Sequence, residues 1–206
     1  MVAEGAAPTV SLEYSTDGNT WSPFKVGTTT VTLANIGDNV YIRANIDNTG
    51  FTSAIDNECY NYFVITGTVS VSGNIMTLLK ADGSVVNLVN STNVNAFSGL
   101  FENCSGIVNA SGLLLPSSTS SGCYNGMFSG CTSLTQAPKL PATTLADYCY
   151  NSMFSGCTSL TSAPELPATT LASNCYANMF RGCTSLTSAP KLPATTLANN
   201  CYYFMF

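Results

Sequence analysis

Residues 149–174 read Cys-Tyr-Asn-Ser-Met-Phe-Ser-Gly-Cys-Thr-Ser-Leu-Thr-Ser-Ala-Pro-Glu-Leu-Pro-Ala-Thr-Thr-Leu-Ala-Ser-Asn, and this 26-residue text decides the fold. It recurs immediately before, over 123–148, and immediately after, over 175–200, with 19 of its 26 columns identical in all three units. Recurrence at a fixed period of 20 to 50 residues is the mark of repeat architectures, in which each unit packs only on its neighbours.

The repeat extends beyond these three units in both directions. Residues 96–104 align with 123–131 as an older, degenerate copy, and residues 201–206 begin another unit. We therefore divide the chain into an N-terminal part, 1–89, and a repeat part, 90–206. The units lie near 97–122, 123–148, 149–174 and 175–200, followed by the incomplete unit 201–206.

A period in this range with recurring leucine indicates coils of the leucine-rich-repeat type, each with a short strand and a helical return. Leu145, Cys149 and Met153 recur every four residues, which predicts one face of a helix, and Gly156 falls where a helix C-cap glycine belongs. Pro138 cannot donate to a sheet ladder, so the predicted strand is short, residues 133–135.

The motif Cys-Tyr-x-x-Met-Phe-x-Gly-Cys-Thr-Ser-Leu-Thr-x-Ala-Pro-x-Leu-Pro resembles the repeat of the BspA-like leucine-rich-repeat surface proteins of gut and oral anaerobic bacteria. The resemblance covers about residues 90–206, and Gly-Cys-Thr-Ser-Leu-Thr is its most specific part. It implies an extracellular solenoid used for adhesion or binding, and it implies no chemistry.

The N-terminal part shows a different pattern, with apolar and polar residues alternating over 10–14, 31–33 and 40–46, and a further strand or pair of strands over 62–71. Turn sequences separate these segments, which predicts a small antiparallel β-sandwich with a core around Trp21, Phe24, Tyr41 and Phe63. We expect it to act as a cap, spacer or attachment module. The predicted fold class is thus a small all-β sandwich followed by a leucine-rich-repeat-like solenoid with short parallel strands and helical returns.

The amino-acid composition limits the classes of partner that the protein can bind. Charged residues make up 8% of the chain, against about 25% in an ordinary soluble domain, and the formal net charge is -5. Nucleic-acid binding needs clustered Lys and Arg, so nucleic acid is excluded as a partner.

The sequence contains no window of 18 consecutive apolar residues and no signal peptide. This predicts no membrane span and leaves two ways for the protein to reach the outside of its cell. Either a signal was removed, or the protein leaves its cell in a phage particle.

The chain contains no histidine, which removes Ser-His-Asp and Cys-His catalysis. Asp56 and Glu58 are the closest pair of carboxylates for glycosidase chemistry, but they lie in a polar loop. Asp47, Asn48 and Asp56 could offer oxygen ligands to calcium, without the spacing of an EF-hand. We therefore predict no catalytic residue, no metal site and no cofactor.

Nine cysteines are present, and seven of them alternate eight and eighteen apart through the repeat, without any Cys-x-x-Cys pair. This spacing argues against zinc and favours two columns of small buried thiols. Disulfides between the two columns remain the alternative. Cys59 lies outside the pattern.

The seven varying columns indicate which positions face solvent or a ligand, because fixed columns must stack identically in every coil. Two of these columns flank the Ala-Pro pair and should share one face. They supply the predicted binding face: Gln136, Lys139, Ser162, Glu165, Ser188 and Lys191. The alternative is that these positions only face solvent and vary in sequence without a functional constraint.

These observations predict a non-enzymatic adhesion or receptor-binding protein on the bacterial cell surface, with a glycan or protein as its partner. The alternative is a structural component of a phage particle, such as a head fibre, capsid appendage or tail-associated receptor-binding protein, in contact with other virion subunits at the virion surface. A carbohydrate-active enzyme is a distant third. Because residues 201–206 would leave aromatic side chains at an open edge, we also expect further repeat units or a covering subunit.

Overall fold

A computed structural model of the 206-residue chain describes residues 11–25, 29–35, 37–44, 63–65, 67–78 and 95–206. Its regular elements are β1 (Leu12–Ser15), β2 (Ser22–Phe24), β3 (Tyr41–Ala44), β4 (Val69–Asn74), the short 3-10 helix η1 (Ile75–Leu78) and β5 (Ile107–Leu114). The rest of the described chain consists of turns and irregular backbone.

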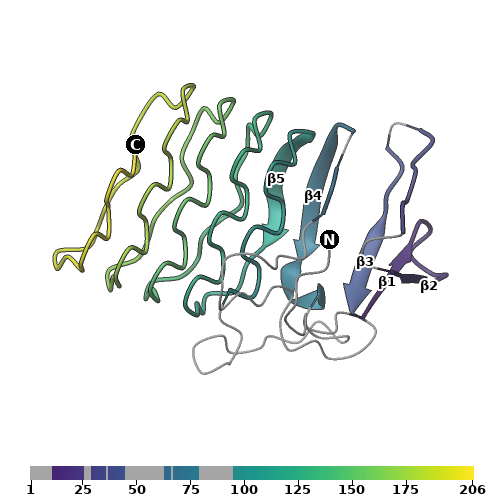
Figure 1. Ribbon diagram of the computed structural model, residues 1–206, viewed down its shortest axis with the longest axis horizontal. Coiled ribbons are helices and arrows are strands. Elements are labelled where there is room, and N and C mark those ends of the chain that lie inside the picture. The colour runs from purple at the N-terminus through teal and green to yellow at the C-terminus, as the bar shows by residue number, and fades with distance from the viewer. Residues whose placement is uncertain (1–10, 26–28, 36, 45–62, 66, 79–94) are drawn as a thin grey trace, which may run out of the picture.

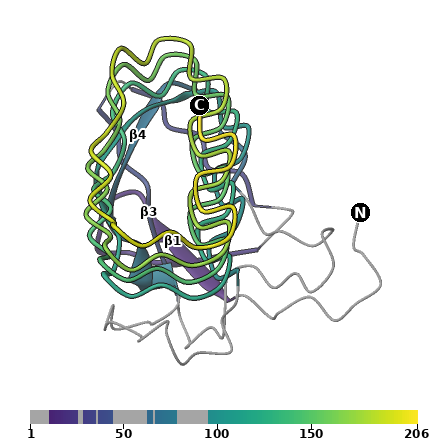
Figure 2. The same ribbon diagram turned by 90° about the vertical axis from the view of Figure 1, so that its left-hand side faces the viewer.

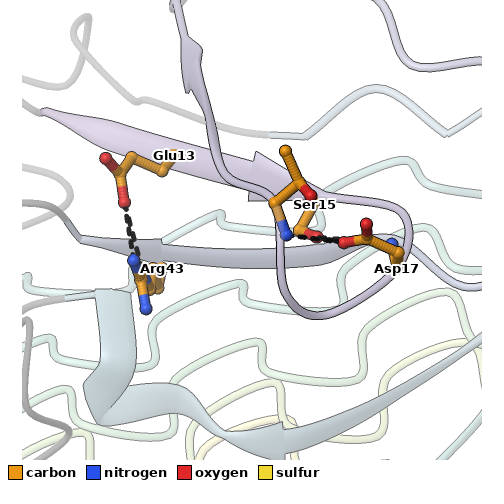
Figure 3. Close-up of polar contacts among 5 residues, drawn as sticks. Glu13, Ser15, Asp17 and Arg43 are labelled. Carbon is orange, nitrogen blue, oxygen red and sulfur yellow. Dashed lines mark hydrogen bonds and ion pairs between the residues drawn. The ribbon is translucent and has the colours of Figure 1, made fainter.

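The N-terminal strands form a three-stranded antiparallel sheet in the order β2-β1-β3. Glu13 on β1 and Arg43 on β3 are register partners, and their side chains form an ion pair of 3.0 Å (Figure 3). The Arg43 guanidinium also lies 3.7 Å from the centre of the Trp21 ring, a cation–π contact. These contacts tie β3 to the β1–β2 hairpin across the outer face of the sheet.

Asp17 organises the turn between β1 and β2. Its Oδ1 accepts hydrogen bonds from the Ser15 hydroxyl at 2.8 Å and from the backbone N–H groups of Asn19 and Thr20 at 2.8 and 2.7 Å (Figure 3 shows the Ser15 contact). Hydrogen bonds to the charged form, chiefly those from Thr20 and Asn19, hold the pKa of Asp17 well below its usual range. The carboxylate therefore replaces the backbone acceptors that this tight turn lacks.

A second, two-stranded parallel sheet joins the N-terminal part to the repeat, because β4 pairs with β5. The predicted β-sandwich is therefore wrong: the described strands form two small sheets, and one strand of the second sheet belongs to the repeat part. The predicted strand around Val31 and Leu33 is also absent from the described residues, and Tyr41, expected in the core, is exposed. Trp21, Phe24 and Phe63 are half-buried.

Successive repeat units lie one above another along the longest dimension of the molecule (Figure 1), and they superimpose when viewed along the stack (Figure 2). We call residues 95–206 the repeat stack. One side of each unit is a turn segment, and these segments cover 95–103, 121–130, 147–156, 173–182 and 199–204. The opposite side is extended backbone.

Backbone hydrogen bonds alternate along each turn segment. In residues 122–131, N–H groups of even-numbered residues donate to carbonyls of the next unit, as from Tyr124 to Cys149 at 2.9 Å. N–H groups of odd-numbered residues donate three positions back within the same unit, as from Met127 to Tyr124 at 3.2 Å. Each turn is thereby closed locally and bonded to its neighbour in the stack.

This alternation shows that the predicted helical return is wrong. Every fourth residue of a turn segment has a positive φ, which an α-helix does not allow; in 122–130 these are Gly122, Gly126 and Gly130, with φ of 62°, 61° and 72°. Apolar residues every four positions fit a four-residue turn repeat as well as a helix of 3.6 residues per turn. Gly156 has φ of 73°, but it ends no helix.

The predicted strand at 133–135 is also wrong, because this side of the stack is bonded too sparsely to form one. Beyond the β4–β5 pair, the described residues make only isolated parallel bridges, between Asn109 and Gln136 and between Thr144 and Thr170. Pro138 has no N–H to donate, and a second proline column at Pro141 removes another donor. With five short strands in two small sheets and almost no helix, the described structure contradicts the predicted sandwich and leucine-rich-repeat-like solenoid.

Two ladders of stacked rings fill the interior of the repeat stack. Successive rings lie 5.5–5.9 Å apart in one ladder and 5.3–5.8 Å apart in the other, with interplanar angles of 23° or less. The first comprises Phe97, Tyr124, Tyr150, Tyr176 and Tyr202; the second comprises Phe63, Phe101, Phe128, Phe154, Phe180 and Phe206. Parallel stacking of this kind contributes roughly 0.5–1.5 kcal/mol per pair beyond the area buried.

Tyr148 provides a test of the left-handed turn positions. It has φ of 56°, whereas the preceding and following units place Gly122 and Asn174 in the same column. An L-residue other than Gly or Asn in this region costs about 1–2 kcal/mol, and the Tyr148 side chain is exposed. We expect Tyr148→Asn to raise the free energy of unfolding by about 1 kcal/mol in a denaturant titration, and Tyr148→Phe to leave it unchanged. Equal stability of the two variants would show that the backbone is unstrained there.

Candidate binding face

The six residues predicted to form a binding face are all exposed: Gln136, Lys139, Ser162, Glu165, Ser188 and Lys191. They lie outside the turn segments, on the extended side of the repeat stack, in two columns that recur from unit to unit. Pro138, between the two columns, and Leu140, directly after the second, are buried. We call these six residues the variable face.

Threonine hydroxyls hold the backbone beneath the variable face. The hydroxyl of Thr135, next to Gln136, donates to the Val108 carbonyl at 2.8 Å. Two units later, the Thr187 hydroxyl donates to the Thr161 carbonyl at 3.3 Å, in the equivalent position. Each bond joins one unit to the unit before it, so the spacing of the face is fixed by the same contacts that stack the units.

The variable face carries two ammonium groups, one carboxylate, two hydroxyls and one amide. Within the described part of the chain, neither lysine nor Glu165 forms an ion pair, so their charges are available to a ligand. Glu165 is the only carboxylate of the six, and hydrolysis of a glycosidic bond needs two. The arrangement can therefore bind polar groups but has no general acid–base pair.

The eight described cysteines are buried and unpaired, which confirms for these residues the prediction of interior thiols over disulfides. In one column the thiols of Cys131, Cys157 and Cys183 donate to carbonyls of the preceding unit at 3.1–3.2 Å, and the Cys104 thiol donates to the Phe63 carbonyl of the N-terminal part at 2.9 Å. The thiols therefore act as small apolar side chains with one weak donor each.

Burial makes these thiols poor nucleophiles. Desolvation raises the pKa of Cys123 and of Cys131 to about 12, and that of Cys175 and of Cys183 to about 11. A thiol attacks, or binds metal, as the thiolate, which is scarce at neutral pH under these conditions. Among the described residues, no group of three or more Cys, Asp or Glu could hold a metal ion.

The tyrosine ladder contains polar atoms without partners. The hydroxyls of Tyr124, Tyr150 and Tyr176 are buried and make no hydrogen bond to the described residues. Desolvation raises the pKa of Tyr150 far above its usual range, so its phenol stays neutral. Phe97 occupies the same ladder in the first unit without a hydroxyl. The ring is thus the part of the side chain that the stack uses.

Five residues that the sequence singled out have no described position. Asp47, Asn48, Asp56, Glu58 and Cys59 lie outside the described residues. Within the described ranges, no helix is long and apolar enough to cross a membrane.

Sequence reasoning missed one surface feature. A hollow of about 390 Å³ lies at the end of the stack, lined by residues that include Phe180, Leu186 and Phe206, with Ser188 of the variable face at its margin. Its signal in the sequence is the group of four aromatic residues within 202–206, which suggested an open edge but not a hollow.

No protein-family model, curated protein or solved structure matches the chain.

The redox state of the thiols is directly measurable. In native buffer near pH 8, we expect iodoacetamide to leave the eight described cysteines unmodified, because they are buried. After unfolding in guanidinium without reductant, all eight should be alkylated, as peptide mass spectrometry would show. Cysteines that escape alkylation in the unfolded chain would be disulfide-bonded and would contradict the arrangement described here.

A pair of substitutions separates the ring of Tyr150 from its hydroxyl. Tyr150→Phe removes a buried polar atom that has no partner among the described residues, so we expect unchanged or higher stability, by up to about 1–3 kcal/mol. Tyr150→Ala removes the ring and should cost roughly 3–5 kcal/mol. Denaturant unfolding of both variants measures the difference. A large loss in Tyr150→Phe would mean that the hydroxyl has a partner.

Proposed function

We propose that this protein is a non-enzymatic binding protein, displayed on a bacterial cell surface, whose variable face binds a glycan or a protein receptor. The main support is that buried positions are identical in successive units, whereas exposed positions on the variable face differ from unit to unit. Leu140, Leu166 and Leu192 are identical in the three complete units, and the first two are buried, whereas the position before each changes from Lys139 to Glu165 to Lys191.

The chemistry of the variable face suits a polar ligand. Hydroxyl, amide, ammonium and carboxylate groups occupy two positions in each unit, which allows several weak contacts to one extended partner. When such contacts are held on one rigid surface, the first contact raises the effective concentration of the ligand for the next, so the affinities combine. The low total charge and the single carboxylate disfavour nucleic acid and hydrolysis respectively.

The interior thiols are compatible with an oxidising exterior. Free cysteine is unusual in secreted proteins, where disulfides normally form. Here burial excludes oxidants and raised pKa values keep the thiols protonated, so oxidation through the thiolate is slow. The resemblance of the repeat to BspA-like surface proteins supports the same location and an adhesive role.

A structural component of a phage particle is the second candidate. The observation in its favour is the elongated arrangement, with the β1–β3 sheet at one end of the stack and residues 181–206 at the other (Figure 1). A head fibre or capsid appendage would attach by one end and extend the other. Detection of the protein in purified virions, and not in cell envelopes, would favour this candidate.

Binding through the variable face is tested with a triple variant, Lys139→Ala, Glu165→Ala and Lys191→Ala. Fluorescently labelled protein would be applied to an array of host and bacterial glycans and to intact host cells. We expect the triple variant to lose at least tenfold in apparent affinity for whatever the wild type retains. Its melting temperature should change little, because exposed substitutions seldom alter stability by more than about 0.5 kcal/mol.

The matched control is Glu102→Ala with Arg181→Ala, which also removes exposed charges but on the turn side of the stack. We expect this control to bind like the wild type. Equal losses in both variants would indicate a general charge effect, and full binding by the triple variant would remove the variable face as the site.

A further inference from the structure

Every second side chain of residues 138–143 faces outward on the extended side of the repeat stack. Lys139, Pro141 and Thr143 are exposed, and the residues beside them in this segment are buried. Side chains two apart along an extended backbone share one face of it. The next unit repeats the pattern, with its outward positions at 165, 167 and 169. We call these three columns, the outward positions of 139–143, 165–169 and 191–195, the platform.

The threonine column of the platform offers hydroxyls that the fold does not use. The Thr143 carbonyl accepts the Thr169 N–H at 3.0 Å, so the backbone of this column is bonded from unit to unit. Within the described part of the chain, the hydroxyls of these two residues make no hydrogen bond. Those of Thr135 and Thr187, in contrast, bond to carbonyls of the preceding unit. The Thr143 and Thr169 hydroxyls are therefore available to a ligand.

The middle column of the platform is apolar. Pro141 is exposed and Pro167 is half-buried, and their rings present C–H groups to solvent. Threonine hydroxyls lie on one side of this column, and the charged groups at 139 and 165 lie on the other. A pyranose ring has the same distribution of chemistry, since its face carries C–H groups and its edges carry hydroxyls. An apolar surface with a few placed polar groups is typical of ligand sites in proteins.

The stacking of the units sets the spacing of the platform. The Tyr150 and Tyr176 rings lie 5.8 Å apart with planes 12° from parallel. On the extended side, Thr144 and Thr170 form a parallel bridge, in which neighbouring backbones lie about 4.7–4.9 Å apart. A pyranose in an extended β-1,4-linked chain has a length in this range. Same-face side chains of an extended peptide recur about every 6.7 Å, so a peptide loses register over three units.

We propose that the platform binds a linear β-1,4-linked polysaccharide, with the chain running along the stack and one sugar residue on each unit. The inference rests on the proposed function, because it names the ligand class for the same side of the stack. Each pyranose face lies on a proline ring. One edge bonds to the threonine hydroxyl and the other to the side chain at 139, 165 or 191. Because that side chain changes between Lys and Glu, the platform favours a neutral polymer over a uniformly charged one.

The first test varies the length of the ligand. Calorimetric titrations would use β-1,4-linked oligomers of glucose and of N-acetylglucosamine, from two to six sugar residues long. We expect the affinity for at least one series to rise about tenfold from the disaccharide to the trisaccharide and then to level off, because three units carry the platform. Maltohexaose is the matched control, since its α-1,4-linked glucose chain is curved, and it should not bind.

The second test varies the protein, with circular dichroism to show that each variant is folded. Deletion of residues 149–174 removes one row of the platform and joins two units with the same fixed columns. This variant should bind the trisaccharide no more tightly than the wild type binds the disaccharide.

Substitution of Thr143→Val with Thr169→Val should weaken binding of the trisaccharide about tenfold in the full chain. The matched control is Ser129→Ala with Ser155→Ala, which removes two hydroxyls on the turn side of the stack and should bind like the wild type.

Three results would overturn the proposal. They are no binding of either β-linked series, an affinity that does not change with the length of the oligomer, and an affinity that the paired threonine substitutions leave unchanged. The proposed function would still stand after any of these if the triple variant of the variable face lost binding to another glycan or to host cells. Unchanged binding by that variant would refute the variable face independently.

Discussion

The alternation of backbone hydrogen bonds in the turn segments is the constraint on which the rest of the stack depends. Because every second N–H is used within its own turn, the others are free to point along the stack and bond the next unit. This requires a left-handed residue at every fourth position, which Gly and Asn supply at low cost and Tyr148 and Phe204 do not. The same geometry sets two of each four side chains inward, where rings stack on rings and thiols bond to carbonyls.

The sequence was sufficient for the period, the buried cysteines and the exposure of the variable face, because each depends only on which columns repeat. It was insufficient for the local conformation. Cys149 and Met153 are four residues apart in a helix or in a four-residue turn, and only the glycines at 126 and 130, also four apart, argue against the helix. The β-sandwich prediction failed because the partner of β4 lies more than thirty residues further along the chain, in the repeat. The alternation of apolar and polar residues within one strand does not show which distant strand it pairs with.

The division between buried, identical columns and exposed, variable columns fits the proposed binding role. Residues such as Leu160 and Cys157 are fixed by stacking on identical neighbours, so selection for binding can act only on the columns that stacking leaves free. Those columns carry mixed charge and hydroxyl groups at regular spacing. The interior, in contrast, holds many ionisable side chains whose burial keeps them neutral, so it stabilises the chain without offering reactive groups.

The near-identity of the units has a consequence at the level of the gene. Unit 149–174 contacts its neighbours through the same columns that those neighbours use to contact each other. Unequal recombination that deletes or duplicates one such segment in frame would recreate an equivalent junction, with rings, thiols and turn bonds in register. A point substitution in a fixed column does not recreate an equivalent junction. The number of units can therefore change more readily than the residues inside a unit. The length of the protein can evolve faster than its cross-section.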